Sequence, residues 1–186
     1  MINQLLLLID IQNDYFPGGN MELHQIEAAA DKASQLLALF RKRNWPIIHV
    51  QHLSVRPNAT FFIPGTQGAE IHTTVFPLKE ETIVQKNFPN SFRQTNLEEI
   101  LQAQNINHLV ICGAMSHMCI DTTTRAANDL GYLITLIHDA CATRNLIFNE
   151  EVVEASKVQA AYMSALNGSF ARVISASEYL MEMGQQ

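Results

Sequence analysis

The sequence predicts an α/β protein in which a six-stranded, mainly parallel sheet is covered by helices on both faces. Short apolar runs alternate with longer stretches of helical period, which is the pattern of a sheet built from strand–helix units. The runs are continuous, as in LLLLI at residues 5–9 and LVIC at residues 109–112, and continuous runs suit strands buried on both faces. The 186 residues amount to about one domain. We therefore expect a single Rossmann-like three-layer α/β/α domain over residues 1–186.

Six apolar runs are the predicted strands of this sheet. Each is short and is bounded by polar, glycine or proline residues. They lie at residues 5–9, 46–53, 82–85, 108–112, 132–137 and 171–174. Because crossovers between parallel strands are right-handed, these runs favour one doubly wound sheet.

The stretches between the strands carry helical signals. Over residues 26–40 the apolar residues recur at the spacing of one helical face, and the basic residues 41–43 suit its C-terminal end. Asn96 can cap a second helix that carries Leu97, Ile100 and Leu101. Two more helices are expected at residues 119–130, before a glycine stop, and from about 149 to 166.

Residues 54–74 interrupt the alternation of strands and helices. Pro57, Pro64, Gly65 and Gly68 lie there between polar residues, which indicates a long loop. Loops of this length in compact domains are often binding lids. We expect this loop to help select the substrate.

Composition and charge narrow the class of partner. The chain has 47% hydrophobic residues and a net charge of −6, and its longest basic block is only residues 41–43. These values predict a packed core and argue against a nucleic-acid or anionic-membrane surface. We expect a small-molecule substrate.

Three cysteines, Cys112, Cys119 and Cys141, are too few and odd in number for a disulfide scaffold. The run at residues 5–9 is too short to span a membrane and lacks the preceding basic residues of a signal peptide. A cytoplasmic location, where a thiol stays reduced, is the resulting prediction.

Ligands of open α/β sheets bind beyond the carboxyl ends of the strands, so the residues that close each apolar run are the candidate site residues. This rule selects Asp10, His52, Lys86 and the segment 113–119, and on the fifth strand His138 with Asp139. An acid, an amine and a thiol are therefore expected to meet at one edge of the sheet.

Cys119 is the strongest candidate for a reactive thiol. It follows a short glycine-containing turn and is expected to open a helix, and both a helix N-terminus and a nearby cation lower a thiol pKa. The alternative is an inert, half-buried thiol. Cys112 falls inside a predicted strand and is assigned to the core, whereas Cys141 is placed past the fifth strand, at the rim of the same edge.

Lys86 and Asp10 each have a simpler explanation as well. A lone lysine is commonly solvated, and an aspartate at a strand end often caps a turn, as nearby Asp14 also can. Together with Cys119 they form the arrangement of an activated nucleophile, in which the acid accepts the thiol proton and the ammonium stabilises the negative charge.

Metal and nucleotide sites have little support. His49, His52 and His72 could supply imidazole ligands, but Glu70 is the only acidic residue in the 50s to 70s of the sequence. No HxH or HExxH spacing appears either. Gly18 and Gly19 lack the GxGxxG spacing. We expect no metal and no cofactor.

Several segments together resemble the isochorismatase-like cysteine hydrolase superfamily, which includes nicotinamidases and N-carbamoylsarcosine amidases. The resemblance covers nearly the whole chain. It is carried by LLLLIDIQNDYFPGG at residues 5–19, KNFPNSF at 86–92, GAMSHMCIDTTTRAANDLGY at 113–132 and LITLIHDA at 133–140.

The resemblance implies a catalytic triad of Asp10, Lys86 and Cys119. It further implies a non-proline cis peptide at Ala114–Met115 and an oxyanion hole formed by the backbone N–H groups of Met115 and Cys119. The sequence departs from the family pattern in two places. Ser116 stands where threonine is common, and the Asp-x-His metal-binding segment of nicotinamidases is missing after the second strand, which puts nicotinamide in doubt as the substrate.

The implied reaction is hydrolysis of a small amide or carbamoyl C–N bond through a thioester on Cys119. Phe16, Phe61, Phe62, Phe88 and Ser116 are candidate pocket residues, although core packing explains each phenylalanine equally well. Two alternatives stay open: hydrolysis of a vinyl ether, as in isochorismatase itself, and a non-catalytic or thiol-sensing protein on the same scaffold. The resemblance also implies a homo-oligomer, a dimer or larger.

Overall fold

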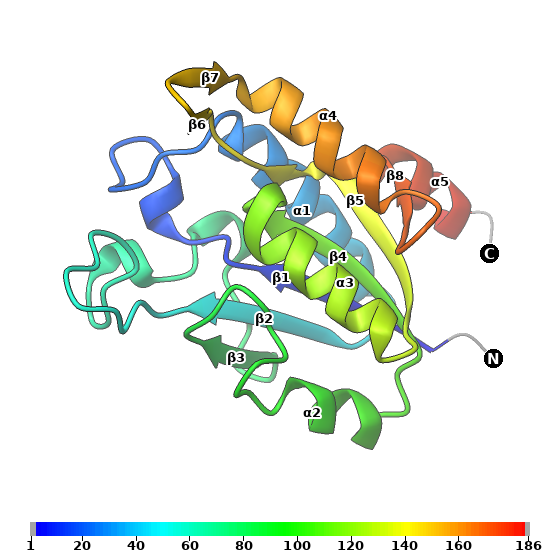
Figure 1. Ribbon diagram of the computed structural model, residues 1–186. Coiled ribbons are helices and arrows are strands. Elements are labelled where there is room, and N and C mark those ends of the chain that lie inside the picture. Colours follow the sequence, from blue (N-terminus) through cyan, green and yellow to red (C-terminus); the bar gives the residue numbers. More distant parts are fainter. Residues whose placement is uncertain (1–2, 185–186) are drawn as a thin grey trace.

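The computed structural model describes residues 3–184, and its centre is a six-stranded parallel sheet (Figure 1). Across the sheet the strand order is β3-β2-β1-β4-β5-β8, with every neighbouring pair parallel. The strands are β1 (Gln4–Ile9), β2 (Ile47–His52), β3 (Thr82–Lys86), β4 (His108–Ala114), β5 (Leu133–Ala142) and β8 (Arg172–Ile174). The winding direction reverses between β1 and β4, and ligands of open α/β sheets bind at such a reversal. The predicted α/β architecture with six parallel strands is confirmed.

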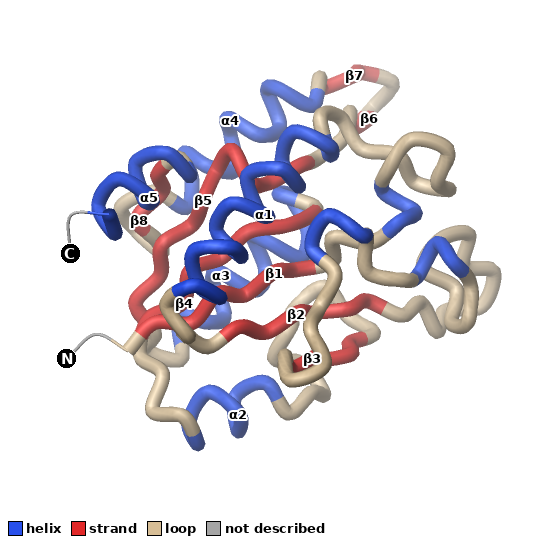
Figure 2. The backbone as a smooth tube through the Cα atoms, turned by 180° about the vertical axis from the view of Figure 1, so that it is seen from behind, coloured by secondary structure: helices blue, strands red, loops and turns tan. Residues whose placement is uncertain are grey.

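Helices cover both faces of the sheet, which explains why the strand sequences are continuously apolar. Leu6 and Leu8 of β1 pack on one side against α1 (Ile26–Lys42) and α5 (Ala176–Gly184). Leu5 and Leu7 pack on the other side, in a cluster to which α2 (Leu97–Ala103), α3 (Asp121–Asp129) and α4 (Ala155–Leu166) contribute residues. Figure 1 shows α3 and α4 in front of the sheet, and Figure 2 shows α1 on the opposite face.

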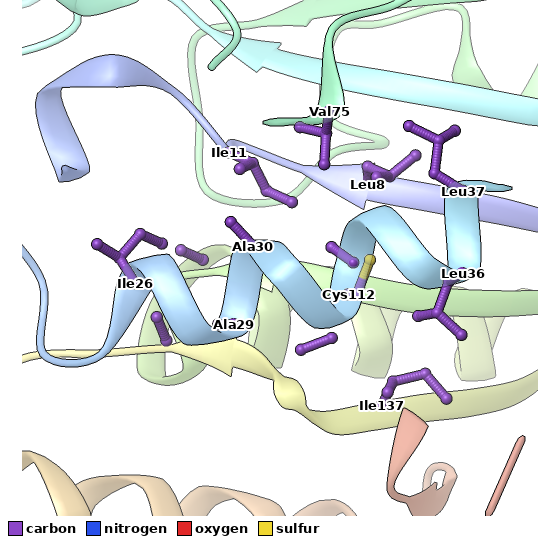
Figure 3. Packing of buried hydrophobic residues seen from close by; sticks show 14 of the residues in the cluster. Leu8, Ile11, Ile26, Ala29, Ala30, Leu36, Leu37, Val75, Cys112 and Ile137 are labelled. Carbon is purple, nitrogen blue, oxygen red and sulfur yellow. The ribbon is translucent and has the colours of Figure 1, made fainter. Parts of the chain in front are cut away.

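The apolar face of α1 packs as its spacing predicts. Ala29, Ala30 and Leu36 of α1 belong to the same buried cluster as Cys112 of β4, and Figure 3 shows these residues close together. Cys112 has no exposed surface, and burial raises the pKa of its thiol well above the usual value. Its assignment to the core is confirmed.

The prediction of a helix from about residue 149 was wrong at its start. Residues 146–153 form a hairpin of β6 (Leu146–Phe148) and β7 (Glu151–Val153), and α4 begins only at Ala155. Asn149 and Glu150 both have positive φ, 48° and 66°, as the favoured two-residue hairpin turn requires. This turn ends any helical path before residue 151. The last helix, α5, lies outside the predicted helices.

The fifth strand is also longer than predicted. β5 continues to Ala142, and Cys141 pairs with Gly113 of β4 after a shift in register. Cys141 is therefore a buried strand residue and not a rim residue, and burial raises the pKa of its thiol to about 12. His138 and Asp139 likewise lie within the strand, so they do not close it.

Gly113 allows β4 to approach the end of β1 closely. It has a φ of 129°, and a Cβ atom at this position would lie 2.0 Å from the carbonyl oxygen of Ile9. Glycine adopts such a φ without steric cost. The close approach brings the two segments that follow β1 and β4 to the same point of the sheet edge.

None of the helices within residues 3–184 combines the length and the apolar character needed to cross a lipid bilayer.

Candidate active site

Asp10, Lys86 and Cys119 are in contact at the carboxyl edge of the sheet. Asp10 follows β1, Lys86 is the last residue of β3, and Cys119 lies in a π-helical turn, Ser116–Ile120, after β4. The Lys86 ammonium donates hydrogen bonds to Asp10 Oδ2 at 2.7 Å and to Cys119 Sγ at 3.2 Å. All three side chains are buried. The strand-end rule thus selected three groups that the fold brings together.

Local backbone structure fixes the acid and the thiol. Asp10 has a φ of 53°, and its N–H donates to the carbonyl of Val50 on β2 at 3.0 Å. The peptide bond between Ala114 and Met115 is cis. The Met115 carbonyl accepts hydrogen bonds from the N–H groups of Met118 and Ile120, which flank the nucleophile, at 3.0 and 3.2 Å. Such π-turns occur frequently at functional sites.

The electrostatics of the site leave the cysteine protonated at rest. Burial raises the pKa of the Cys119 thiol, the Asp10 carboxylate raises it further, and the Lys86 ammonium opposes this only in part. The sequence favoured a lowered thiol pKa, and the structure differs because burial and the carboxylate outweigh the cation. For Lys86, burial disfavours the ammonium, but Asp10 and Cys119 outweigh it and raise its pKa.

One oxygen of Asp10 remains available to the thiol proton. Oδ2 accepts the hydrogen bond from Lys86, whereas Oδ1 is buried and has no hydrogen-bond partner within residues 3–184. An unpaired buried carboxylate oxygen is costly to leave without a donor, so this oxygen is open to a hydrogen bond from a neighbouring group. The geometry therefore provides a thiol, a base for its proton and a fixed cation for the resulting thiolate.

His52 is a fourth member of the cluster, and the triad pattern does not include it. Its Nδ1 lies 3.0 Å from Lys86 Nζ and 4.0 Å from Asp10 Oδ2. Burial lowers the pKa of His52 to about 4, with Asp10 opposing and Lys86 adding to the effect, so the ring is neutral at pH 7. Because Nδ1 faces a donor, the ring proton belongs on Nε2.

Gln12 holds His52 in place. Its side-chain oxygen accepts the His52 N–H at 2.8 Å, and its side-chain nitrogen donates to the His52 carbonyl at 2.9 Å. The Gln12 side chain is fully buried, so both bonds are shielded from water. The strand-end rule located His52, but only the fold shows that its ring faces Lys86.

We expect His52→Asn to make unfolding less sensitive to acid. The folded-state pKa of about 4 lies below the ordinary value, so the unfolded chain binds the extra proton and stability falls as the pH drops from 6.5 to 4. The asparagine oxygen can still accept from Lys86 but does not titrate. Between pH 7 and 4.5 the free energy of unfolding of the wild type should fall by roughly 2–3 kcal/mol more than that of the variant.

Urea unfolding at both pH values measures this difference directly. Other groups titrate in the same window in both proteins and cancel in the comparison. Parallel declines for wild type and His52→Asn would show that the fold does not lower the pKa of the His52 ring.

The cluster has the donor atoms of a metal site, but an ammonium lies among them. Ligand atoms of Asp10, His52 and Cys119 all fall within 4.8 Å of one another. Lys86 Nζ lies within 3.2 Å of an atom of each of the three. A divalent cation beside this ammonium would be strongly repelled, so these residues fit a fixed lysine better than a metal.

The other histidines considered as metal ligands have different partners. His49 is buried and contacts Glu81 Oε2 at 3.0 Å. His72 stacks on Phe16 with ring centroids 3.5 Å apart. The fold does not bring either of them into the triad cluster.

A cavity of about 280 Å³ opens onto Cys119. Its walls come from the π-helical turn, from residues after β1 and β3, and mainly from the segment 54–61 that follows β2, inside the predicted long loop. The lining residues are Tyr15, His52, Ser54, Arg56, Pro57, Asn58, Ala59, Thr60, Phe61, Asn87, Pro89, Met115, Met118 and Cys119. In Figure 1 this segment lies at the edge of the sheet toward which the arrowhead of β2 points.

The segment is closed at its base and anchored to the residues that follow β1. The Ser54 N–H donates to the Phe62 carbonyl at 2.8 Å, which joins its two ends. The Phe62 N–H in turn donates to buried Asp14 Oδ2 at 2.6 Å. Asp14 thus has the structural role considered for it, while Asp10 contacts Lys86.

Of the five candidate pocket residues, Phe61 lines the cavity, whereas the other four do not, so the prediction was wrong for them. Phe62 is fully buried and packs on Tyr15, with ring centroids 4.6 Å apart. Phe88 lies under the guanidinium of Arg93, and its carbonyl accepts from Lys86 at 3.2 Å.

The remaining two candidates are Phe16, which packs in the core on the side of α1, and Ser116. The Ser116 hydroxyl hydrogen-bonds to the Ala142 carbonyl and to the Gln159 side chain. It therefore fixes the start of the nucleophile turn against β5 and α4.

Comparison with known proteins identifies the family. A family model described as the isochorismatase domain matches residues 4–178. The uncharacterized isochorismatase family protein YddQ of Bacillus subtilis is 48% identical, covering 94% of this chain and 97% of its own. A crystal structure of an isochorismatase-class hydrolase from Oleispira antarctica superposes with a TM-score of 0.93 at 48% identity and covers 96% of each chain.

A more distant relative is named for an amide substrate. The nicotinamidase of Escherichia coli is 25% identical over 178 residues, covering 76% of this chain and 84% of its own. The matched family model, the relatives and the shared fold together identify the class of this protein: the chain belongs to the isochorismatase family of hydrolases.

Proposed function

We propose that this hydrolase cleaves the C–N bond of a small amide or carbamoyl compound through a thioester on Cys119. The observation that carries the proposal is a buried thiol that lines a cavity, with Sγ 3.2 Å from Lys86 Nζ and within 4.8 Å of a carboxylate oxygen of Asp10. An acid that works by protonation alone needs no such thiol, so this arrangement favours covalent catalysis over vinyl ether hydrolysis.

The first half-reaction forms the thioester. Asp10 takes the Sγ proton through Oδ1 while sulfur attacks the carbonyl carbon, and the Lys86 ammonium stabilises the negative charge on sulfur. Met115 and Cys119 both line the cavity, and their N–H groups are the proposed donors to the tetrahedral oxyanion. Asp10 then gives its proton to the leaving nitrogen, and the C–N bond breaks.

The second half-reaction restores the enzyme. Asp10 takes a proton from a water molecule, which attacks the thioester carbonyl and releases a carboxylic acid. The proton returns to sulfur as the thiol reforms. His52 is neutral and takes no part in this proton transfer; its contact with Lys86 keeps the ammonium aligned with both partners. Because the mechanism needs a free thiol, we also propose a reducing compartment such as the cytoplasm.

A relative supports amide hydrolysis as the reaction, while a sequence departure argues against nicotinamide as the substrate. The Escherichia coli relative is named as a nicotinamidase, which supports amide hydrolysis as a class. In this chain, however, residues 49–52 lack the Asp-x-His segment, and His52 contacts Lys86. We therefore do not propose nicotinamide itself as the substrate.

Trapping the acyl group tests the proposal. The enzyme is mixed with a panel of small amides, quenched in acid and examined by intact mass and peptide mapping, while released ammonia is measured in parallel. We expect ammonia release together with an adduct on Cys119 that equals the acyl group of the amide. Cys141→Ser is the matched control, because that buried thiol is remote from the mechanism and its loss should leave the adduct in place. Pyruvate release from isochorismate, with no amide hydrolysed, would overturn the proposal.

A further inference from the structure

The cavity beside Cys119 has one positive charge that nothing in the structure neutralises. Asp10 and Lys86 form an ion pair, His52 is neutral and Cys119 is a thiol, so the catalytic cluster has no net charge. Among the described residues that line the cavity, Arg56 alone carries a further charge. Within residues 3–184 its guanidinium takes part in no hydrogen bond, ion pair or ring contact.

Arg56 is close enough to the catalytic cluster for its charge to affect a residue of that cluster. Its positive charge is one of the influences that lower the pKa of His52. The chain as a whole carries a net charge of −6, so its overall field repels anions. A cavity lined by the positive charge of Arg56, in a protein that is acidic overall, can bind an anionic substrate locally.

The rest of the wall indicates the size and character of such a substrate. At about 30 Å³ for each water-sized group, 280 Å³ holds about nine non-hydrogen atoms. Phe61, Met118 and the ring of Tyr15 supply apolar surface to the same cavity that Arg56 and the thiol line. A short hydrocarbon chain with a polar group at each end fits this distribution.

We propose that the substrate is a small amide that also carries a carboxylate, which Arg56 binds while the amide carbonyl lies at Cys119. Arg56 is then the specificity-determining residue, because a guanidinium binds a carboxylate through two parallel hydrogen bonds. The proposal rests on the amide hydrolysis proposed above and deepens it by naming the substrate class.

Matched pairs of amides test the role of the carboxylate. Malonamate, succinamate and glutaramate are each compared with the corresponding diamide, which has the same number of non-hydrogen atoms but no charge. The three chain lengths sample three separations between the carboxylate at Arg56 and the amide carbonyl at the thiol. We expect kcat/KM for at least one acid to exceed that of its diamide by about 10- to 100-fold, the range of a charged hydrogen bond.

Variants of Arg56 then test whether this residue causes the preference for the acid over the diamide. Arg56→Gln should bring the ratio of acid to diamide close to one, mainly through KM for the acid, and Arg56→Lys should keep part of the preference. Arg172→Gln is the matched control, since Arg172 is also exposed and lies on β8, outside this cavity. Its ratio should equal that of the wild type. No preference in the wild type, or a preference that survives Arg56→Gln, would overturn the inference.

A binding measurement separates this inference from the proposed function. If no amide is hydrolysed, the proposed function fails, but protection of Cys119 from iodoacetamide still reports occupancy of the cavity. Succinate should slow alkylation more than succinamide does, and Arg56→Gln should remove the difference. Equal effects of the two compounds on the wild type would show that the cavity has no anion site.

Discussion

Cys119→Ala is expected to lower kcat/KM for amide hydrolysis by at least roughly 10,000-fold, because among the described residues that line the cavity Cys119 is the only thiol that can form the acyl intermediate. Sγ is 3.2 Å from Lys86 Nζ, whereas Cys112 and Cys141 are buried in β4 and β5. Cys119→Ser should be nearly as impaired, since a hydroxyl is far harder to deprotonate than a thiol. Ammonia release, followed over a range of amide concentrations so that kcat/KM is obtained, is the measurement.

The folded state should survive this change. The ion pair between Asp10 and Lys86 does not involve the sulfur, and removing one buried sulfur atom costs about 1 kcal/mol of unfolding free energy. Urea unfolding of Cys119→Ala therefore serves as the control. Full amide turnover by this variant would rule out covalent catalysis on Cys119.

Asp10→Asn should separate thiol reactivity from catalysis. Losing the base and acid of the reaction should reduce kcat by about 10²- to 10⁴-fold. The same change removes a negative charge that raises the pKa of Cys119, so its thiol should ionise at lower pH. An inactive enzyme whose Cys119 alkylates faster than in the wild type is the expected result, measured with iodoacetamide between pH 7 and 9.

Lys86→Met is the matched opposite of this variant. It removes the cation that lowers the thiol pKa, so alkylation of Cys119 should become slower while activity is also lost. Asp10→Asn additionally leaves Lys86 buried without its counter-ion, which should cost roughly 3–5 kcal/mol of stability.

Slower alkylation of Cys119 in Asp10→Asn than in the wild type would contradict the prediction for that variant. It would show that the Asp10 carboxylate is not what raises the pKa of the thiol.

The strand pattern was sufficient to predict most of the fold. Buried parallel strands are continuously apolar, so their positions follow from local sequence, and their ends meet at one edge. This is why Asp10, Lys86 and Cys119 could be grouped before any contact was known. The hairpin at residues 146–153 was missed because its apolar residues also fit a helix, and only the positive φ angles at Asn149 and Glu150 exclude one.

The electrostatics and the walls of the site could not be predicted in the same way. The thiol pKa depends on how completely the fold buries Cys119 and on which carboxylate it faces. The contact between His52 and Lys86 joins residues 34 positions apart on neighbouring strands. Arg56 lies in a segment without periodicity, so nothing in its local sequence separates it from an ordinary surface arginine.

The hydrogen bond between Ser54 and Phe62 has a consequence for how new substrates can arise. It makes residues 54–62 a self-contained loop whose ends stay together whatever lies between them. Surface loops of this kind tolerate changes in length and sequence. The catalytic residues lie at the ends of the strands and in the turn after β4, outside this loop. One insertion or exchange within the loop can therefore change which substrate binds and leave the reaction unchanged. Substrate range and catalytic power can then evolve independently.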